Sequence, residues 1–224
     1  MARIDLARRA QIGRDRSART RAELIAAART LYAAHPFEQV TVDDLVGAAG
    51  VAKGTFYVHF DSLAELQNLV ADDLAREFDE LLQPRRLALE DPIERIAAGC
   101  GAFILQTLRD PAWGMLVARS AATMPHVADV ARKRLKEDID RAARDGHLDG
   151  VTPELAFDFA SGIMLHMMLS APQRERSPQE ASAIVASLLR AIGVAPDKAA
   201  AVAREAIDRE QGYLRPETSH RKRK

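Results

Sequence analysis

Apolar residues recur every three or four positions along most of the chain, and no stretch alternates convincingly between apolar and polar residues at period two. This spacing places apolar side chains on one face of a helix. Proline and glycine divide the periodic stretches from one another. The pattern predicts helices at residues 20–35, 42–48, 52–58, 62–84, 92–109, 112–121, 125–144, 153–170, 178–192 and 196–211. The sequence therefore predicts an all-α fold.

Three of these helices are expected to begin at a capping box, in which Ser or Thr is followed three residues later by Asp or Glu. The pairs are Thr20 with Glu23, Thr41 with Asp44, and Ser62 with Glu65. The helix after Ser62 is expected to end at Pro84, because proline interrupts helical hydrogen bonding. Its predicted buried stripe is Leu63, Leu66, Val70, Leu74, Phe78 and Leu81.

The stretch from Thr41 to Phe60 reads T-V-D-D-L-V-G-A-A-G-V-A-K-G-T-F-Y-V-H-F. It predicts two short helices joined by a tight turn at Gly50 and Val51, which is the geometry of a helix-turn-helix. Its apolar positions should lock the pair against the preceding helix; they are Leu45, Ala48, Ala49, Val51 and Phe56. The polar side chains left on the second helix suit phosphates and base edges; they are Lys53, Thr55, Tyr57 and His59.

This stretch resembles the hallmark of the TetR family of bacterial transcriptional regulators, T-V-x-x-[IL]-[AV]-x-x-[AS]-G-V-[AS]-x-G-[TS]-[FL]-Y-x-[HY]-F, over residues 20–70. The resemblance implies nine or ten helices, a dimer and an effector pocket in the C-terminal body. It implies phosphate contacts for Thr41, Thr55, Tyr57 and His59. It places Lys53, Gly54 and Val58 at base edges or at the groove wall.

Two positions depart from the family pattern. Ala52 stands where a helix-capping Ser is frequent, and Leu63 stands where a Lys often reaches a phosphate. The arginine-rich segment ahead of the first helix could compensate, with Arg16 and Arg19 as candidate DNA contacts, as basic arms do in other DNA-binding proteins. A solvated tail is the alternative interpretation of this segment.

Charge is strongly segregated although 32 basic and 32 acidic residues cancel over the whole chain. Residues 1–22 carry a net charge of +5, residues 215–224 carry +4, and the remainder carries −9. Basic ends are a common feature of proteins that contact polyanions. The expected organisation is a basic flexible arm (1–19), a helix-turn-helix domain (20–66), an effector-binding and dimerisation domain (67–212) and a basic tail (213–224).

Several classes of protein are not expected. The single Cys100 excludes an intramolecular disulfide, no Cys and His residues have zinc-ligand spacing, and the longest apolar run, 97–105, is too short to cross a bilayer. The arginine-rich N-terminus does not resemble a secretory signal. No catalytic signature is present. We expect a cytoplasmic bacterial protein, nucleoid-associated when bound to DNA, that is not an enzyme and needs no metal or cofactor.

The C-terminal body is rich in bulky, adaptable apolar residues that could line an effector pocket or simply form the core. The candidate pocket residues are Phe103, Trp113, Met115, Met124, Phe157, His166 and Met167. His166 could be a core histidine, a polar group in the cavity or a residue of a dimer interface. The dimer is expected to form through 153–170 and 178–192, which carry the small residues Ala160, Ser161 and Gly162 and the apolar residues Ile184, Val185, Leu188, Leu189 and Ile192.

The sequence thus predicts a sequence-specific DNA-binding regulator. We expect a homodimeric repressor that binds a palindromic double-stranded operator and is released by a small apolar or amphipathic effector. Two alternatives stay open: a transcriptional activator, and a helical small-molecule-binding protein whose helix-turn-helix is vestigial.

Overall fold

A computed structural model describes residues 2–123, 129–173 and 177–214, and the predicted all-α fold is confirmed, since no strand occurs within these ranges. The helices are α1 (Ala2–Ala34), α2 (Val42–Ala49), α3 (Lys53–His59), α4 (Leu63–Leu87), α5 (Pro92–Arg109), α6 (Pro111–Thr123), α7 (Asp129–Arg144), α8 (Pro153–Ser170), the short 3₁₀ helix η1 (Ala171–Gln173), α9 (Pro178–Ala191) and α10 (Pro196–Leu214). None of the described helices is long and apolar enough to cross a membrane.

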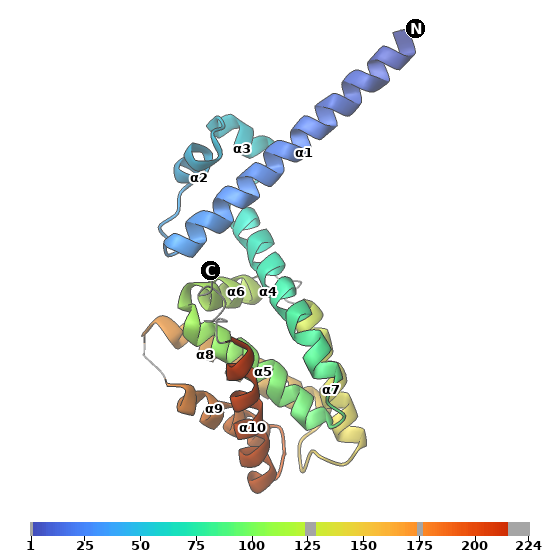
Figure 1. The fold of residues 1–224 in the computed structure, drawn as a ribbon, viewed down its shortest axis with the longest axis vertical. Coiled ribbons are helices and arrows are strands. Elements are labelled where there is room, and N and C mark those ends of the chain that lie inside the picture. The colour runs from blue at the N-terminus through green and yellow to red at the C-terminus, as the bar shows by residue number, and fades with distance from the viewer. Residues whose placement is uncertain (1, 124–128, 174–176, 215–224) are drawn as a thin grey trace, which may run out of the picture. The chain divides into compact units, whose positions relative to one another are not determined.

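The chain divides into two compact units, Met1–Val70 and Ala71–Lys224. In the first unit, α2 and α3 lie beside α1 (Figure 1). The core of this unit includes the fully buried residues Leu24, Ala28, Leu45, Phe56 and Leu66. Ala48 was expected in this core but is exposed, because the buried stripe of α2 follows Leu45, Val46 and, in part, Ala49.

Helix α1 begins at Ala2, so the prediction of a helix start near Thr20 is wrong. The preceding segment contains no proline and is rich in Ala and Arg, which favour helix. Side-chain pairs one turn apart add support, with Gln11 donating to Asp15 at 2.7 Å and Arg19 donating to Glu23 at 2.9 Å. The segment expected to be a flexible arm is therefore part of α1 from Ala2 onward.

Helix α4 continues to Leu87, so the prediction that it ends at Pro84 is also wrong. The last turn is held by tertiary contacts, because Leu82 and Arg86 are buried. Leu81, expected in the buried stripe, is 70% exposed. Proline inside a helix removes a backbone hydrogen bond and lowers helix stability. The burial of the turn that follows Pro84 compensates for this loss.

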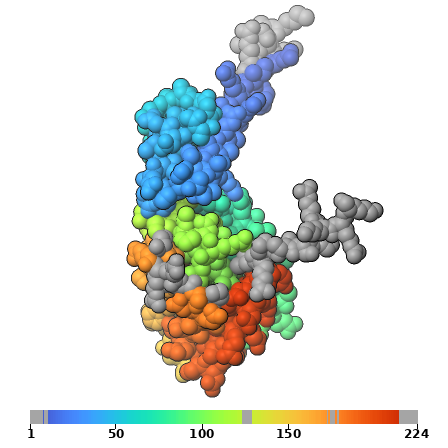
Figure 2. Space-filling view, turned by 60° about the vertical axis from the view of Figure 1, so that its left-hand side comes forward, coloured from blue at the N-terminus to red at the C-terminus, as the bar shows by residue number. Residues whose placement is uncertain are grey.

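In the second unit, α5 is buried on most of its surface and packs against α6, α7, α8, α9 and α10 (Figure 1). Helices α9 and α10 pack on each other and form adjoining orange and red surfaces in Figure 2. Four apolar residues that were expected at the dimer interface instead lie in the core of the single chain; they are Val185, Leu188, Leu189 and Ile192.

Candidate nucleic-acid interface and ligand cavity

The start of α2 is fixed by Thr41 and Asp44. The Thr41 hydroxyl accepts from the Asp44 amide at 3.2 Å and donates to the Asp44 carboxylate at 2.6 Å, while the Thr41 amide donates to the same carboxylate at 2.9 Å. The hydrogen bond from the Thr41 hydroxyl has the largest effect on the Asp44 carboxylate, and that from the Thr41 amide the next largest. Together they hold the pKa of Asp44 below its ordinary value. The predicted capping box at this position is confirmed.

The turn between α2 and α3 depends on Gly50. Its φ of 67° lies in the left-handed region, which glycine adopts without a steric penalty. The Val51 amide then donates to the Val46 carbonyl at 3.0 Å and closes the end of α2. The following residue, Ala52, precedes α3 without a side-chain cap, as the sequence implied. The predicted Gly-Val turn therefore sets the direction in which α3 leaves α2.

Helix α3 is anchored by one buried ring and presents most of its other side chains to solvent. Phe56 is fully buried, with its ring centroid 5.7 Å from that of Phe60. Tyr57 is 54% exposed and Val58 is 76% exposed. The remaining predicted DNA-contacting residues of α3 are exposed (Lys53 and Gly54) or half-buried (Thr55 and His59). The sequence pattern for this helix therefore separates the anchor from the exposed surface correctly.

Lys53 is paired with Asp43, which the sequence analysis did not single out. The Lys53 ammonium lies 2.9 Å from the Asp43 carboxylate, and both side chains are exposed. The hydrogen bond from Lys53 to Asp43 and the charge of Asp43 raise the pKa of Lys53. An acidic residue in the first turn of α2 is an ordinary helix-dipole feature, so no local signal indicated that Asp43 meets Lys53.

The candidate arm residues lie on α1. Arg16 is exposed, and Arg19 is paired with Glu23 in an ion pair whose cation is largely exposed. An exposed pair of this kind contributes little to stability, so its arginine remains available to exchange partners.

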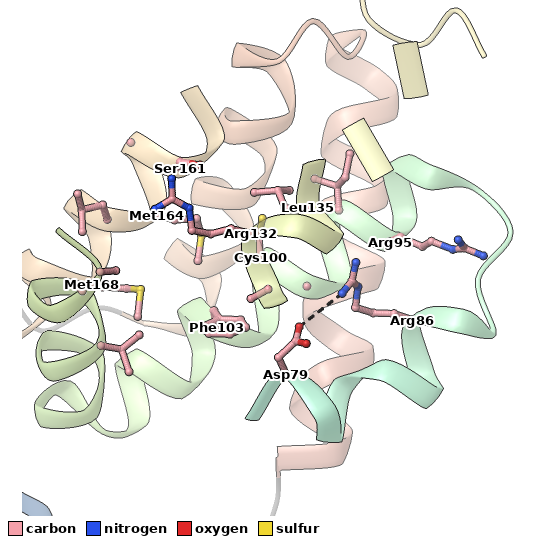
Figure 3. Close-up of a pocket in the computed structure, with 18 residues that line it drawn as sticks. Asp79, Arg86, Arg95, Cys100, Phe103, Arg132, Leu135, Ser161, Met164 and Met168 are labelled. Carbon is pink, nitrogen blue, oxygen red and sulfur yellow. Dashed lines mark ion pairs between the residues drawn. The ribbon is translucent and has the colours of Figure 1, made fainter. Parts of the chain in front are cut away.

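The second unit contains a half-open cavity of about 270 Å³ that residues of α4, α5, α6, α7 and α8 line (Figure 3). The lining is mostly apolar but includes five polar or charged side chains of interest, those of Asp79, Arg86, Arg95, Arg132 and Ser161. The apolar wall includes Cys100, Phe103, Leu135, Met164 and Met168. Burial raises the pKa of the Cys100 thiol to about 12, so it is neutral and unreactive at physiological pH.

Of the pocket residues proposed from the sequence, Phe103 lines the cavity. Trp113 packs behind it, with ring centroids 5.7 Å apart. Phe157 lies under the Arg132 guanidinium at 5.7 Å. The others lie away from the lining: Met115 and Met167 are half-buried, and His166 is exposed, so it is not a core histidine of this chain. Met124 lies outside the described residues.

Beside the cavity lies a cluster of buried charges that the sequence analysis missed. Asp79, Arg86 and Asp138 are each less than a tenth exposed. One Arg86 amino group lies 2.5 Å from the Asp138 carboxylate, and the other lies 3.6 Å from the Asp79 carboxylate, along the dashed line in Figure 3. Arg134 also pairs with Asp79, and Arg95 lies 3.8 Å from Asp138. Buried charges are tolerated when they are paired in this way.

A signal for this cluster was present in the periodicity of α4. Its buried face runs through Ala71, Ala75, Asp79, Leu82 and Arg86, which are three or four residues apart. Two charges in register with a buried apolar stripe indicate a buried ion pair or a polar site. The more conspicuous stripe of leucines concealed this one, because both have helical spacing. Asp138, by contrast, stands among other charged residues of α7 and gave no such signal.

An exposed helix-turn-helix together with a helical unit that contains a cavity is the architecture of a DNA-binding regulator with a separate helical domain. Residues 24–68 match the family described as "Bacterial regulatory proteins, tetR family", and residues 91–205 match "Tetracyclin repressor-like, C-terminal domain". The chain belongs to the TetR family of transcriptional regulators.

Solved structures of TetR-family regulators share this fold. RolR in complex with resorcinol is 25% identical, with a TM-score of 0.73, over 84% of this chain and 95% of RolR. RolR without ligand is 24% identical, with a TM-score of 0.70, over 82% and 96%. FadR from Bacillus subtilis with stearoyl-CoA is 15% identical, with a TM-score of 0.61, over 76% and 96%. No curated protein sequence matches the chain.

Proposed function

We propose that the protein is a homodimeric repressor that binds a palindromic operator and is released by a small effector held in the cavity of the second unit. The exposed face of α3 carries this proposal, because Lys53, Tyr57 and Val58 project from a helix that a single buried ring anchors. Such a helix can enter a major groove while its buried ring stays in the core of the first unit.

The proposed roles on DNA follow from chemistry. Thr41, Thr55, Tyr57 and His59 would bind phosphates, and Lys53, Gly54 and Val58 would meet base edges or the groove wall. Gly54 would let the DNA approach α3 closely because it has no side chain, and nothing inside the protein requires a glycine there, since a Cβ would meet no atom within 4 Å. Phosphate contacts would supply most of the affinity and groove contacts the selectivity.

The proposed dimer is supported by an apolar face on α8 that the single chain leaves exposed. Leu155 is 47% exposed and Phe159 is 44% exposed, and Gly162 and His166 follow on the same face at helical spacing. On α9, the exposed residues Ala183 and Ser187 are small, which permits close approach of a second helix. Two copies of α8 and α9 would then form a four-helix bundle and assign His166 to the interface.

Release by an effector is supported by the cavity and by the RolR structure, which holds resorcinol. The effector must bind the state that does not fit DNA more tightly than the state that does, since equal affinity shifts no equilibrium. If the effector ends DNA binding, repression is a simpler regulatory outcome than activation.

The proposal is tested by a gel shift of the full-length protein on the DNA upstream of its own gene, with a scrambled duplex as control. We expect one retarded species, at a stoichiometry of two chains per site, that scrambled DNA does not compete away. Equal binding to both duplexes, or no binding to either, would contradict sequence-specific regulation.

The proposed DNA contacts of the N-terminal part of α1 are tested by deleting residues 2–16, which leaves the buried core residues from Leu24 onward in place. If Arg8, Arg14 and Arg16 bind phosphates, the slope of log affinity against log salt should fall by about 0.9 for each phosphate that the deletion variant no longer neutralises. An identical slope in the deletion variant would show that this part of α1 does not contribute to DNA binding.

A further inference from the structure

We propose that the ligand of the cavity is a ring-sized apolar molecule that carries an oxygen acceptor, bound between Arg86 on α4 and Ser161 on α8. This inference rests on the proposed function, because it names the chemical class of the effector. It is carried by the size of the cavity, by two buried polar atoms that lack partners and by the charge of the lining.

The size of the cavity limits the ligand. About 270 Å³ is available, whereas a cavity of about 150 Å³ suffices for benzene. The space therefore fits a substituted single ring or a small bicyclic molecule. The apolar lining from Phe103, Met164 and Met168 suits such a body, since methionine adapts to the outline of a ring.

Two buried polar atoms at the cavity have no hydrogen-bond partner among the described residues. They are Nε of Arg86 and Oγ of Ser161, and both residues belong to the lining. An unpaired buried donor costs free energy, so a ligand that pairs with it gains more than a ligand that meets an already paired group. The two amino groups of Arg86 are already occupied by Asp79 and Asp138, which leaves Nε as the donor for a ligand.

Nε is buried beside Gly99, a lining residue that has no side chain. Gly99 lies on α5, and a Cβ at this position would lie 3.5 Å from Nε. In the view of Figure 3, Asp79 and Arg86 lie on one side, Ser161 and Arg132 lie on the other, and Cys100 and Phe103 lie between them. A ligand with polar groups at two ends and an apolar ring between them matches this arrangement.

Charge selects the kind of polar group. The charged lining residues are three arginines, Arg86, Arg95 and Arg132, and one aspartate, Asp79. Arg134 and Asp138 pair with members of this set, so the whole group has four arginines and two aspartates. A cationic ligand would meet this excess of positive charge, whereas an oxygen acceptor would be stabilised. A carboxylate and an acidic ring hydroxyl share this chemistry.

The test uses the full-length protein without DNA and five probes of similar ring size: benzoate, 3-hydroxybenzoate, resorcinol, toluene and benzylamine. Calorimetric titration gives the affinities and thermal melting an independent readout. We expect benzoate or resorcinol to bind at least about tenfold more tightly than toluene, as a charge-assisted hydrogen bond implies, and benzylamine to fail to bind. The preferred oxygen probe identifies the carboxylate or the hydroxyl as the source of the acceptor.

Two conservative variants locate the contacts. Gly99→Ala lies inside a helix, where alanine is favoured, so the free protein should melt no lower than wild type; its methyl group at Nε should abolish most of the preference for benzoate over toluene. Ser161→Ala removes a hydroxyl that has no partner in the free protein, so it should leave folding and benzoate affinity unchanged. We expect wild type to bind 3-hydroxybenzoate more tightly than benzoate, because the ring hydroxyl pairs with Ser161, and Ser161→Ala should abolish this preference.

The ligand class is overturned if toluene or benzylamine binds as tightly as the oxygen probes, if no probe binds, or if Gly99→Ala keeps the wild-type preference. A parallel gel shift keeps the two proposals apart. Equal binding to the upstream DNA and to scrambled DNA would refute the proposed regulator but not the ligand class. A probe that binds the cavity as expected but leaves the DNA complex intact would refute the effector role alone.

Discussion

At the scale of single residues, the charge on the exposed face of the helix-turn-helix is balanced locally. Lys53 lies at the start of α3 with Asp43 beside it, and both are open to solvent. Such a pair contributes little to stability, because water and salt screen it and two long side chains must be ordered. Its consequence would lie in binding, since Asp43 would compete with DNA for the Lys53 ammonium that we propose to reach the groove.

Substitution of Lys53 by Ala is expected to weaken operator binding by about 1–3 kcal/mol and to relax preference at one operator position, because the side chain proposed to reach the groove is removed. The matched variant Asp43→Ala frees Lys53 and removes a negative charge, so operator and random DNA should both bind more tightly. Anisotropy titrations on a set of single-base operator variants measure both effects. Unchanged base preference in Lys53→Ala would refute the groove contact.

The capping box at α2 predicts a pH-dependent stability. Thr41→Ala should lower the free energy of unfolding by about 1 kcal/mol at neutral pH, since the Thr41 hydroxyl caps the Asp44 amide. The pKa of Asp44 is lowered in the folded protein, so its contribution is present above the ordinary value of 3.8 and is lost as the pH falls through the lowered value. In urea unfolding, Asp44→Asn should therefore have a lower free energy of unfolding than wild type at pH 7, and the two values should converge near pH 2. A pH-independent difference would argue against the carboxylate.

At the scale of elements, local signals placed most helices correctly, and tertiary contacts decided the exceptions. Residues 92–109 and 153–170 were predicted with the bounds that α5 and α8 have, because proline at the first helical position and a capping residue before it mark both starts. The end of α4 could not be predicted, because buried Arg86 and its partner on α7 lie 52 residues apart in the chain.

The packing of α5 against α6 depends on a glycine. A Cβ at Gly114 would lie 2.4 Å from Cγ2 of Thr107, a stiff, buried side chain on the facing helix. We expect Gly114→Ala to destabilise the protein by about 1–3 kcal/mol, even though alanine is the better helix former.

Chemical denaturation measures this loss of stability, and two further variants serve as controls. Thr107→Ala combined with Gly114→Ala should recover part of the loss in stability, because the clashing atoms are removed. Gly212→Ala on α10, where a Cβ meets nothing within 4 Å, should be neutral or stabilising. Equal effects of Gly114→Ala and Gly212→Ala would refute the steric explanation.

At the scale of the whole molecule, the proposed dimer requires the exposed face of α8. Phe159→Asp places a charge on this face and should shift sedimentation from dimer to monomer, with loss of operator affinity and little change in helicity, since Phe159 is 44% exposed in the single chain. Leu81→Asp is the matched control, because Leu81 is an exposed apolar residue of α4. A dimer that survives Phe159→Asp, or one that Leu81→Asp dissociates equally, would exclude this interface.

The helical class, the helix-turn-helix and the family could all be predicted from the amino-acid sequence. These features depend on residues close together in the chain, such as the Thr41 cap, the Gly50 turn and the Phe56 anchor. The polar part of the cavity, in contrast, emerged only when the helices were packed together. Arg86 and Ser161 come from α4 and α8, Asp138 beside them comes from α7, and each is an ordinary residue in its own segment. Periodicity reports which face of a helix is buried, but not which residues of other helices that face meets.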